Sequence, residues 1–266
     1  RAKCCLLVFV DDATSRIVSM RFEESETTVG YFRCIESHLK KYGRPLAYYS
    51  DRHSIFRTTR STDGYFQDTE LHRSLKELGV ELVCAYSSQA KGRVERANQT
   101  LQDRLIKEMR LKGISDIQSA NGYLAGFIES YNKKFSVTAA NPQDAHRKVH
   151  HSDQTLSRVL SHHYTRKLSK ALEFSFDANP YQVQVPGKGY RYQNSRVKIY
   201  QHHTGDIEVL HGEEVLKVVA LDKTTKGPIL ADRKDIDRVF DQEILPKINS
   251  TLSLPTGSTA PEFPCT

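Results

Sequence analysis

The feature that most constrains the fold is a change of pattern near residue 150. Up to that point, strand-like apolar runs alternate with helical patterns, which predicts one α/β domain over residues 1–150. From 171 to 235 there are only short strand-like runs separated by glycine and proline, which favours a small all-β barrel. We expect a basic linker at 151–170 and a disordered tail rich in Pro, Ser and Thr at 249–266.

Two kinds of element are expected within the first domain. Apolar runs at 4–10 and 17–22 flank turn residues and predict a β-hairpin. A helix is expected to end at Gly43, and a further strand to end at Asp51. A long helix follows residue 90, and its predicted core face carries Val94, Ala97, Leu101, Leu105 and Met109.

Charge and composition narrow the classes of function. The 39 Lys and Arg residues exceed the 32 Asp and Glu residues, and most of the surplus lies in the first 150 residues. Basic stretches at 91–112 and 147–170 favour a polyanionic partner, most plausibly nucleic acid. An apolar share of 38% excludes wholesale disorder, and no apolar run is long enough to span a membrane.

The five cysteines contain no Cys-x-x-Cys pair, which argues against a disulfide framework and against a Cys-ligated zinc site. We interpret them as reduced thiols of a cytoplasmic protein.

Asp51 and Glu95 are the candidate catalytic residues. Asp51 closes an apolar strand, and a carboxylate at the C-terminal end of a strand projects into the region where α/β proteins place active sites. Glu95 lies early in the long helix, beside its predicted apolar face, and shares a face with Gln99 and Gln102. The ordinary alternative for such residues is a surface acid and an ion pair within a helix.

Two segments carry a resemblance to a known family. Residues 49–56 (YSDRHSIF) and 87–98 (SSQAKGRVERAN) resemble the second and third acidic blocks of the integrase-core, or DDE, transposases of bacterial insertion sequences. These enzymes are relatives of retroviral integrases. The resemblance covers residues 1–150, including the hairpin and the end of the core near residues 131–146. It implies a ribonuclease-H-like mixed sheet with flanking helices.

The resemblance also implies a function. The chain would carry out metal-dependent DNA strand cleavage and transfer during DNA integration, with Asp51 and Glu95 binding Mg²⁺ or Mn²⁺. Hard cations of this kind prefer carboxylate oxygens, and two of them can stabilise the attacking and leaving oxygens of a phosphodiester. The expected partners are transposon-end DNA, target DNA and further copies of the chain assembled on DNA, with no membrane involved. The residues expected to contact DNA are Lys91, Arg93, Arg96, Gln99, Gln102, Arg104 and Lys107.

One acid of the expected triad is missing from its usual place. The family carries its first Asp in a strand before the hairpin, so we expect this chain to lack that Asp, that strand and any N-terminal helix-turn-helix. Asp11 and Asp12 lie where a strand gives way to a turn, and we interpret them as turn residues; the alternative is that one of them completes the triad. Two hypotheses therefore stand. One is a transposase core, and the other is a catalytically inactive, truncated or domesticated DNA-binding remnant.

Overall fold

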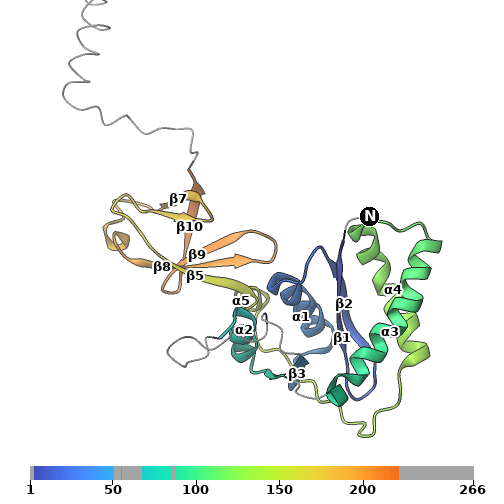
Figure 1. The fold of residues 1–266 in the computed structure, drawn as a ribbon. Helices are drawn as coiled ribbons and strands as arrows, with labels where there is room; N and C mark the ends of the chain where they lie inside the picture. The colour runs from blue at the N-terminus through green and yellow to red at the C-terminus, as the bar shows by residue number, and fades with distance from the viewer. Residues whose placement is uncertain (1–2, 51–54, 56–67, 85–87, 222–266) are drawn as a thin grey trace, which may run out of the picture.

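The computed structural model describes residues 3–50, 55, 68–84 and 88–221, and at residues 84, 88–91 and 93 it describes the backbone alone. The described chain has an α/β part followed by a separate antiparallel sheet (Figure 1). Across these residues, no helix combines the length and apolar character needed to cross a membrane. The predicted disordered tail at 249–266 lies outside the described residues.

The α/β part begins with the predicted hairpin. Strand β1 (Cys5–Val10) pairs antiparallel with β2 (Ile17–Glu23), and the register shifts between Phe9 and Val10. Ser15 adopts a left-handed conformation with φ 58°, which reverses the chain. Strand-length apolar runs on both sides of turn residues are therefore sufficient to predict this element.

Helix α1 (Thr28–Tyr42) follows the hairpin and has well-defined ends. The Thr27 hydroxyl accepts a hydrogen bond from the Gly30 amide at its start. The helix stops at Gly43, whose φ of 93° suits glycine, as the sequence predicted.

A parallel strand pair lies beside α1. Strands β3 (Ala47–Ser50) and β4 (Glu81–Cys84) pair in parallel, and α2 (Glu70–Leu78) forms part of the connection between them. This is the arrangement that parallel pairing requires, because the chain must cross over before it can run in the same direction again.

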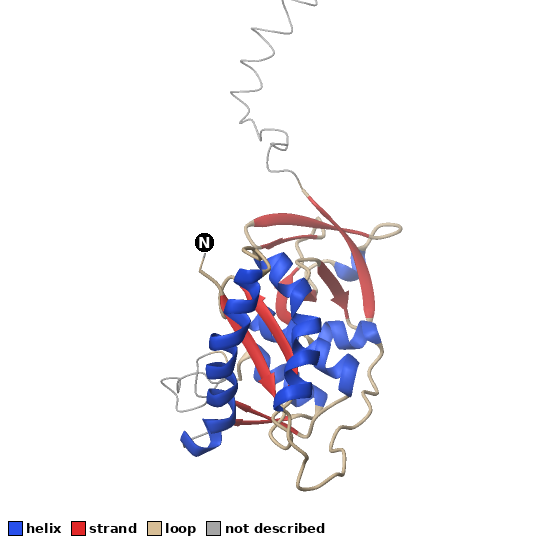
Figure 2. Cartoon of the chain, turned by 90° about the vertical axis from the view of Figure 1, so that its right-hand side faces the viewer, coloured by secondary structure: helices blue, strands red, loops and turns tan. Residues whose placement is uncertain are grey.

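Two long helices cover the hairpin. Helices α3 (Ser88–Leu111) and α4 (Ile117–Phe135) lie in front of its strands when seen from their own side (Figure 2). Together with β2 they enclose an apolar core, here called the α4 cluster, whose buried members are Ile17, Met20, Phe22, Leu101, Leu105, Ala120, Leu124, Phe127 and Tyr131.

Two asparagines of α4 bind the backbone of β2. The Asn132 side chain accepts from the Ile17 amide at 2.8 Å and donates to the Ile17 carbonyl at 2.9 Å. Asn121 makes the same pair of hydrogen bonds to Phe22, at 2.8 and 3.0 Å. The side-chain amides therefore satisfy backbone groups of β2 that β1 does not reach.

The C-terminal part is an antiparallel sheet of six strands in the order β5-β8-β9-β10-β7-β6. The short strand-like runs that the sequence shows at 181–185, 196–201, 207–210 and 215–220 correspond to β7, β8, β9 and β10, while β5 and β6 were not predicted. Its buried residues form the sheet cluster, with members Leu168, Phe174, Phe176, Val183, Tyr192, Val197, Ile199, Val209 and Leu216. The strands are β5 (Ser161–Lys167), β6 (Glu173–Phe176), β7 (Asn179–Gln184), β8 (Arg196–His202), β9 (Ile207–His211) and β10 (Glu214–Ala220).

The segment 151–170, expected to be a linker, is folded. It contains α5 (Asp153–Val159) and the edge strand β5. Leu156, Val159 and Leu160 pack into the core of the α/β part, because α1 and α2 present an apolar surface to them. This core, here called the α1 cluster, also contains Phe32, Ile35, Leu39, Leu71, Leu75, Leu78 and Val80.

Candidate functional site

The segments that lead to the two candidate acids start from the same end of the parallel strand pair. Ser50, the last residue of β3, is paired with Cys84, the last residue of β4. The chain therefore leaves both strands at the same end of the pair. After β3 it continues to Asp51, and after β4 it continues to α3. Asp51 itself lies outside the described residues.

Glu95 lies on the second turn of α3 and is exposed. Gln99 and Gln102 are exposed too, while Ala97, Leu101 and Leu105 are buried. The prediction that Glu95 and the two glutamines share the face beside the apolar stripe agrees with this burial pattern. The Glu95 carboxylate is thus accessible to a ligand from solvent.

Val94 differs from expectation, since its exposed fraction is 39% although it was assigned to the apolar face. Among the residues whose side chains are described, the buried positions of α3 begin at Ala97. Helical periodicity predicts the direction of a side chain but not how far along the helix the core extends.

Three of the basic residues predicted to contact DNA each make a contact within the chain. Arg96 donates to the carbonyl of Gly92 within its own helix, and Lys107 forms an ion pair with Asp103 one turn earlier. The Arg104 guanidinium lies over the Phe135 ring, 5.0 Å from its centroid. The structure does not describe the side chains of Lys91 and Arg93.

The Lys107–Asp103 pair is a surface interaction. The Lys107 ammonium, which donates a hydrogen bond to Asp103, holds the pKa of that carboxyl below its usual value. Both side chains are largely exposed, so the pair adds little stability and can exchange for a phosphate contact.

Asp11 is engaged in the hairpin turn. Its carboxylate accepts hydrogen bonds from the amide and the hydroxyl of Thr14, and its backbone carbonyl accepts from Ser15. This geometry agrees with the interpretation of Asp11 as a turn residue.

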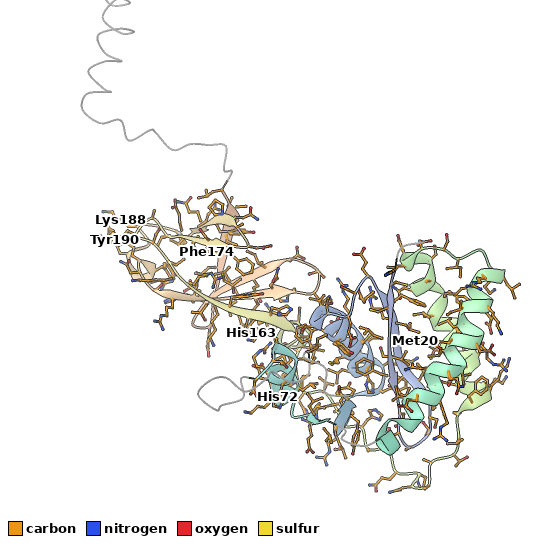
Figure 3. The ribbon with its side chains drawn as sticks, viewed as in Figure 1. Met20, His72, His163, Phe174, Lys188 and Tyr190 are labelled. Atoms are coloured by element: carbon orange, nitrogen blue, oxygen red, sulfur yellow. The ribbon has the colours of Figure 1, made fainter. Side chains whose placement is uncertain are left out.

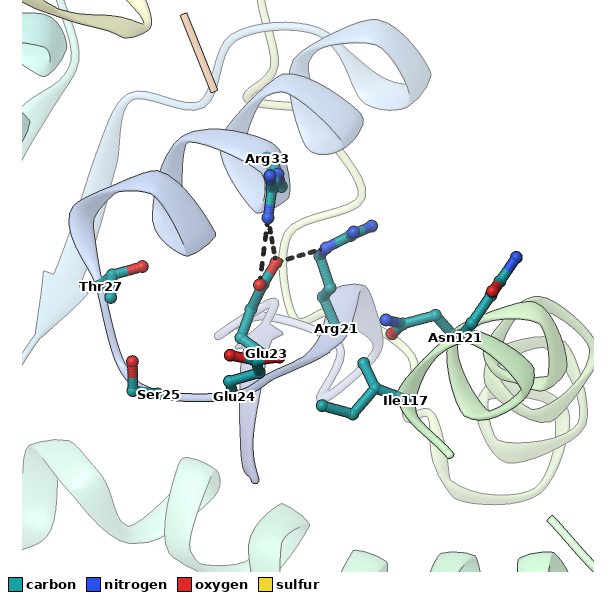
Figure 4. A pocket seen from close by; sticks show the side chains of 9 residues that line it. Arg21, Glu23, Glu24, Ser25, Thr27, Arg33, Ile117 and Asn121 are labelled. Atoms are coloured by element: carbon teal, nitrogen blue, oxygen red, sulfur yellow. Dashed lines mark hydrogen bonds and ion pairs between the residues drawn. The ribbon is translucent and has the colours of Figure 1, made fainter. Parts of the chain in front are cut away.

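Sequence reasoning overlooked a second carboxylate at a strand end. Glu23 closes β2 and lies in a cavity of about 580 Å³ between the start of α1 and the start of α4 (Figure 4). It accepts hydrogen bonds from Arg21 at 2.6 Å and from Arg33 at 3.1 Å. Arg33 also donates to the carbonyl of His203, in the turn after β8. Glu23 therefore helps to position the C-terminal sheet against α1.

The signal that could have found Glu23 is its position directly after an alternating apolar run, which is the same signal that selected Asp51. Its partner Arg33 could not be found in this way, because Arg33 reaches it from a different element. Throughout the part of the chain that the structure describes, no three His, Cys, Asp or Glu residues come together as a metal site.

Comparisons with known proteins show which proteins this chain is similar to. No family model matches the chain. "Putative transposase y4bF" of Sinorhizobium fredii is 46% identical over 175 residues, which are 65% of this chain and 38% of that protein. "Transposase for insertion sequence IS1202" of Streptococcus pneumoniae is 34% identical over 129 residues, which are 47% of this chain and 28% of that protein.

One solved structure is also similar, that of a simian T-cell lymphotropic virus intasome in complex with PP2A regulatory subunit B56 gamma. It shows a TM-score of 0.40 and 14% identity over 82% of this chain and 70% of the other. The chain spans 38% and 28% of the length of the two curated relatives. Because an identity of 46% over 175 residues reflects common descent, the chain is homologous to a part of these bacterial transposases.

Proposed function

We propose that this chain is the catalytic core and C-terminal part of a DDE-type transposase that cleaves and joins DNA strands. The observation that carries the proposal is the 46% identity with a named transposase over 175 residues. In this proposal, the α/β part is a ribonuclease-H-like core and the six-stranded sheet is a small barrel. The core would use Asp51 and Glu95 as its catalytic carboxylates.

The backbone supports the pairing of these two acids. The parallel strands β3 and β4 end side by side. The segment that leads to Asp51 and the segment that leads to α3 both start at that end of the pair. Glu95 is exposed on α3 rather than buried in the α4 cluster. A rigid strand pair and a long helix can hold two carboxylates near each other despite their mutual repulsion.

The donor set suits Mg²⁺ or Mn²⁺, because the oxygen atoms of Glu95 and Asp51 are hard ligands and the described Glu95 carboxylate faces solvent. Such ions supply charge stabilisation for the attacking and leaving oxygens of an in-line displacement. Asp51 and Glu95 would hold the cations. We propose that Asp11 is not the third acid, since its carboxylate is occupied by Thr14.

Two surfaces are proposed to bind DNA. On α3, Arg96, Arg104 and Lys107 would contact phosphates near the acids, and exposed Gln99 and Gln102 would contact the substrate from the same helix. Lys91 and Arg93 complete this proposed set.

The second surface is the outer face of β5 and β8. Lys167 lies directly opposite Arg196 in the cross-strand register, and Thr165 lies opposite Lys198. All four are exposed, and the three basic residues form no ion pair within the described part of the chain. Like charges directly opposite each other are unfavourable in isolation, which supports a polyanion as their partner.

The loop between β7 and β8 extends this surface. Lys188 and Tyr190 lie at the end of the sheet far from the α/β part (Figure 3). Tyr190 has an exposed fraction of 67%, and an exposed aromatic ring beside a lysine can contact both a base and a phosphate. The proposed partners are transposon-end and target DNA, bound by several copies of a cytoplasmic protein.

The test is cation-dependent cleavage of transposon-end DNA by the natural full-length protein. Asp51→Asn and Glu95→Gln are each expected to reduce cleavage by at least about a thousandfold, because a metal ligand is lost. Glu129→Gln, on the exposed face of α4, is the matched control and should retain activity. Asp11→Asn should also retain it.

The competing remnant hypothesis predicts a different outcome. A protein that binds transposon-end DNA but shows no cleavage with Mg²⁺ or Mn²⁺ would be a DNA-binding remnant. Loss of cleavage in Asp11→Asn, with the fold intact, would instead make Asp11 part of the triad.

A further inference from the structure

Four polar side chains meet at the C-terminal end of α1. His38, with an exposed fraction of 3%, has its Nδ1 atom 2.7 Å from the hydroxyl of Tyr48 on β3. Its Nε2 atom is 3.1 Å from Nε2 of His146, which lies in the loop between α4 and α5. The Nδ1 atom of His146 is 2.8 Å from the carboxylate of Asp144.

The hydrogen-bond partners fix where the protons lie. The pKa of Asp144 is held low by the backbone amide of His146, so this carboxylate is ionised and its partner Nδ1 carries hydrogen. The Nε2 atom of neutral His146 is then an acceptor and receives the Nε2 hydrogen of His38. Burial raises the pKa of Tyr48, so its hydroxyl keeps its proton and donates to Nδ1 of His38.

This chain of hydrogen bonds tolerates one extra proton but not two. One extra proton on the pair is accommodated if the hydrogen of His38 moves to Nδ1 and Tyr48 accepts it. A second proton places a hydrogen on both facing Nε2 atoms and two positive charges about 3 Å apart. Such an arrangement is repulsive and lies partly out of water.

The surroundings of His38 favour its neutral form. Burial, together with the charge of His146, lowers the pKa of His38 to about 4, and only Asp11 acts in the opposite direction. Tyr42 packs its ring against both imidazoles, and Lys41 lies over that ring, 5.1 Å from its centroid. The loop and its docking site also carry the charged residues Asp144, Arg147 and Arg44.

A second contact joins the same loop to the same place. Arg44 and Arg147 form an antiparallel bridge, with both N–O distances 2.8 Å. The backbone approach is close, because a Cβ atom on Gly43 would lie 2.7 Å from the carbonyl oxygen of Arg147. Val149 then packs against the α1 cluster. The loop at residues 144–149 is therefore pinned at three successive points.

We propose that His38 and His146 form a pH-operated latch that holds the loop at residues 144–149 on the end of α1 and releases it in acid. Opening the loop exposes His38 to water, where its ordinary pKa is 6.5. The open state therefore binds more protons than the closed state between pH 6.5 and about 4, and falling pH favours opening throughout that window. Release would loosen the connection between α4 and α5, which joins the helices over the hairpin to the C-terminal sheet.

Hydrogen exchange of the two bridge amides tests the latch in the complete chain. The amides of Arg44 and Arg147 should lose protection by up to about tenfold per pH unit below 6.5, after correction for the intrinsic exchange rate. Reference amides of Leu105 and Val209 should remain protected over the same range. Equal loss at the reference amides would indicate global unfolding and would overturn the proposal.

Variants distinguish protonation of the two histidines from a general effect of acid on the fold. His38→Gln should abolish the pH dependence of the Arg147 amide, while His150→Gln, an exposed histidine of the same loop, should leave it unchanged. If His38→Gln does not fold, His146→Gln serves in its place. It should lower protection at pH 7, because His38 loses its hydrogen-bond partner, and it should reduce the pH dependence, because a positive charge at His146 no longer opposes protonation of His38. An unchanged profile in His146→Gln, or constant protection in the natural chain from pH 7 to 4.5, would refute the latch.

Discussion

The α/β part and the C-terminal sheet bury their apolar residues in different ways. The sheet cluster draws all its members from residues 168–216, which lie on neighbouring strands and turns of one sheet. The α1 cluster instead joins α1 and α2 to Leu156, Val159 and Leu160, which lie far along the chain. The comparison teaches that the boundary between the two parts is set by packing near residue 160, and not by the change of composition near residue 150.

The largest expected effect tests that boundary directly. Leu160→Ala should cost about 2–5 kcal/mol of unfolding free energy, because a fully buried side chain is truncated. Although Leu160 directly precedes β5, the loss of hydrogen-exchange protection should appear in α1 and α2. Leu216→Ala is the matched control, of similar cost, with its loss in β8, β9 and β10. The same set of weakened amides in both variants would contradict the division.

A second test concerns polar rather than apolar contacts in the α/β part. Asn132→Ala should cost about 2–4 kcal/mol, since it leaves both backbone groups of Ile17 without partners in a buried place. Asn121→Ala removes the same pair of bonds from Phe22 at a partly exposed position and should cost about 1–2 kcal/mol. Chemical denaturation measures both. Equal costs would show that burial does not set the size of this effect.

A third test probes the ion pair that joins the two parts. Arg158 of α5 holds Glu208 of β9 with two hydrogen bonds of 2.8 Å, and this lowers the pKa of the Glu208 carboxyl. A lowered pKa stabilises the fold above the ordinary value of 4.5, and the stabilisation is lost as the pH falls below it.

Glu208→Gln should therefore cost about 1–2 kcal/mol at pH 7 and less near pH 3.5, measured by urea denaturation at both values. Glu213→Gln, an exposed acid in the turn before β10, is the control and should change little at either pH. A cost that does not change with pH would assign the effect to packing.

The smallest effect distinguishes stability from binding in the sheet. Lys167→Gln should stabilise the chain by about 0.2–1 kcal/mol, because it removes a like charge opposite Arg196. The same variant should weaken DNA binding and reduce its salt dependence by about one released ion. Lys170→Gln, outside the strands, should not stabilise. A variant that loses stability would show that this pair of like charges is not under repulsion.

Local signals predicted much of the α/β part. The hairpin follows from turn residues between two apolar runs, and the end of α1 follows from a glycine at positive φ; both signals act within a few residues. The same reasoning failed for β5, whose sequence begins with serine and two histidines. Ser161 is buried and the two histidines are half-buried, because Phe32 packs on His162 and Arg73 donates to the carbonyl of Ser161. Contacts of that kind are invisible to a local pattern.

The candidate site was predictable to a similar degree. The exposure of Glu95 follows from helical periodicity, and so does the burial of Leu101 and Leu105. Val94 was misjudged because periodicity gives the angle around a helix but not the extent of its covered surface. The pairing of Asp51 with Glu95 stays a prediction, since Asp51 lies outside the described residues.

The spacing of the two asparagines along α4 matches the spacing of their backbone partners along β2. They are eleven positions apart, which is about 16 Å along a helix, while Ile17 and Phe22 are five positions apart, or about 13–17 Å along a strand with a register shift. Residues an odd number apart in a regular strand point their backbone groups to opposite edges. The shift beside Phe9 and Val10 corrects that parity, so both Ile17 and Phe22 face α4. The two spacings therefore match. Inserting or deleting a single residue between Asn121 and Asn132, or between Ile17 and Phe22, would break the hydrogen bonds at one end.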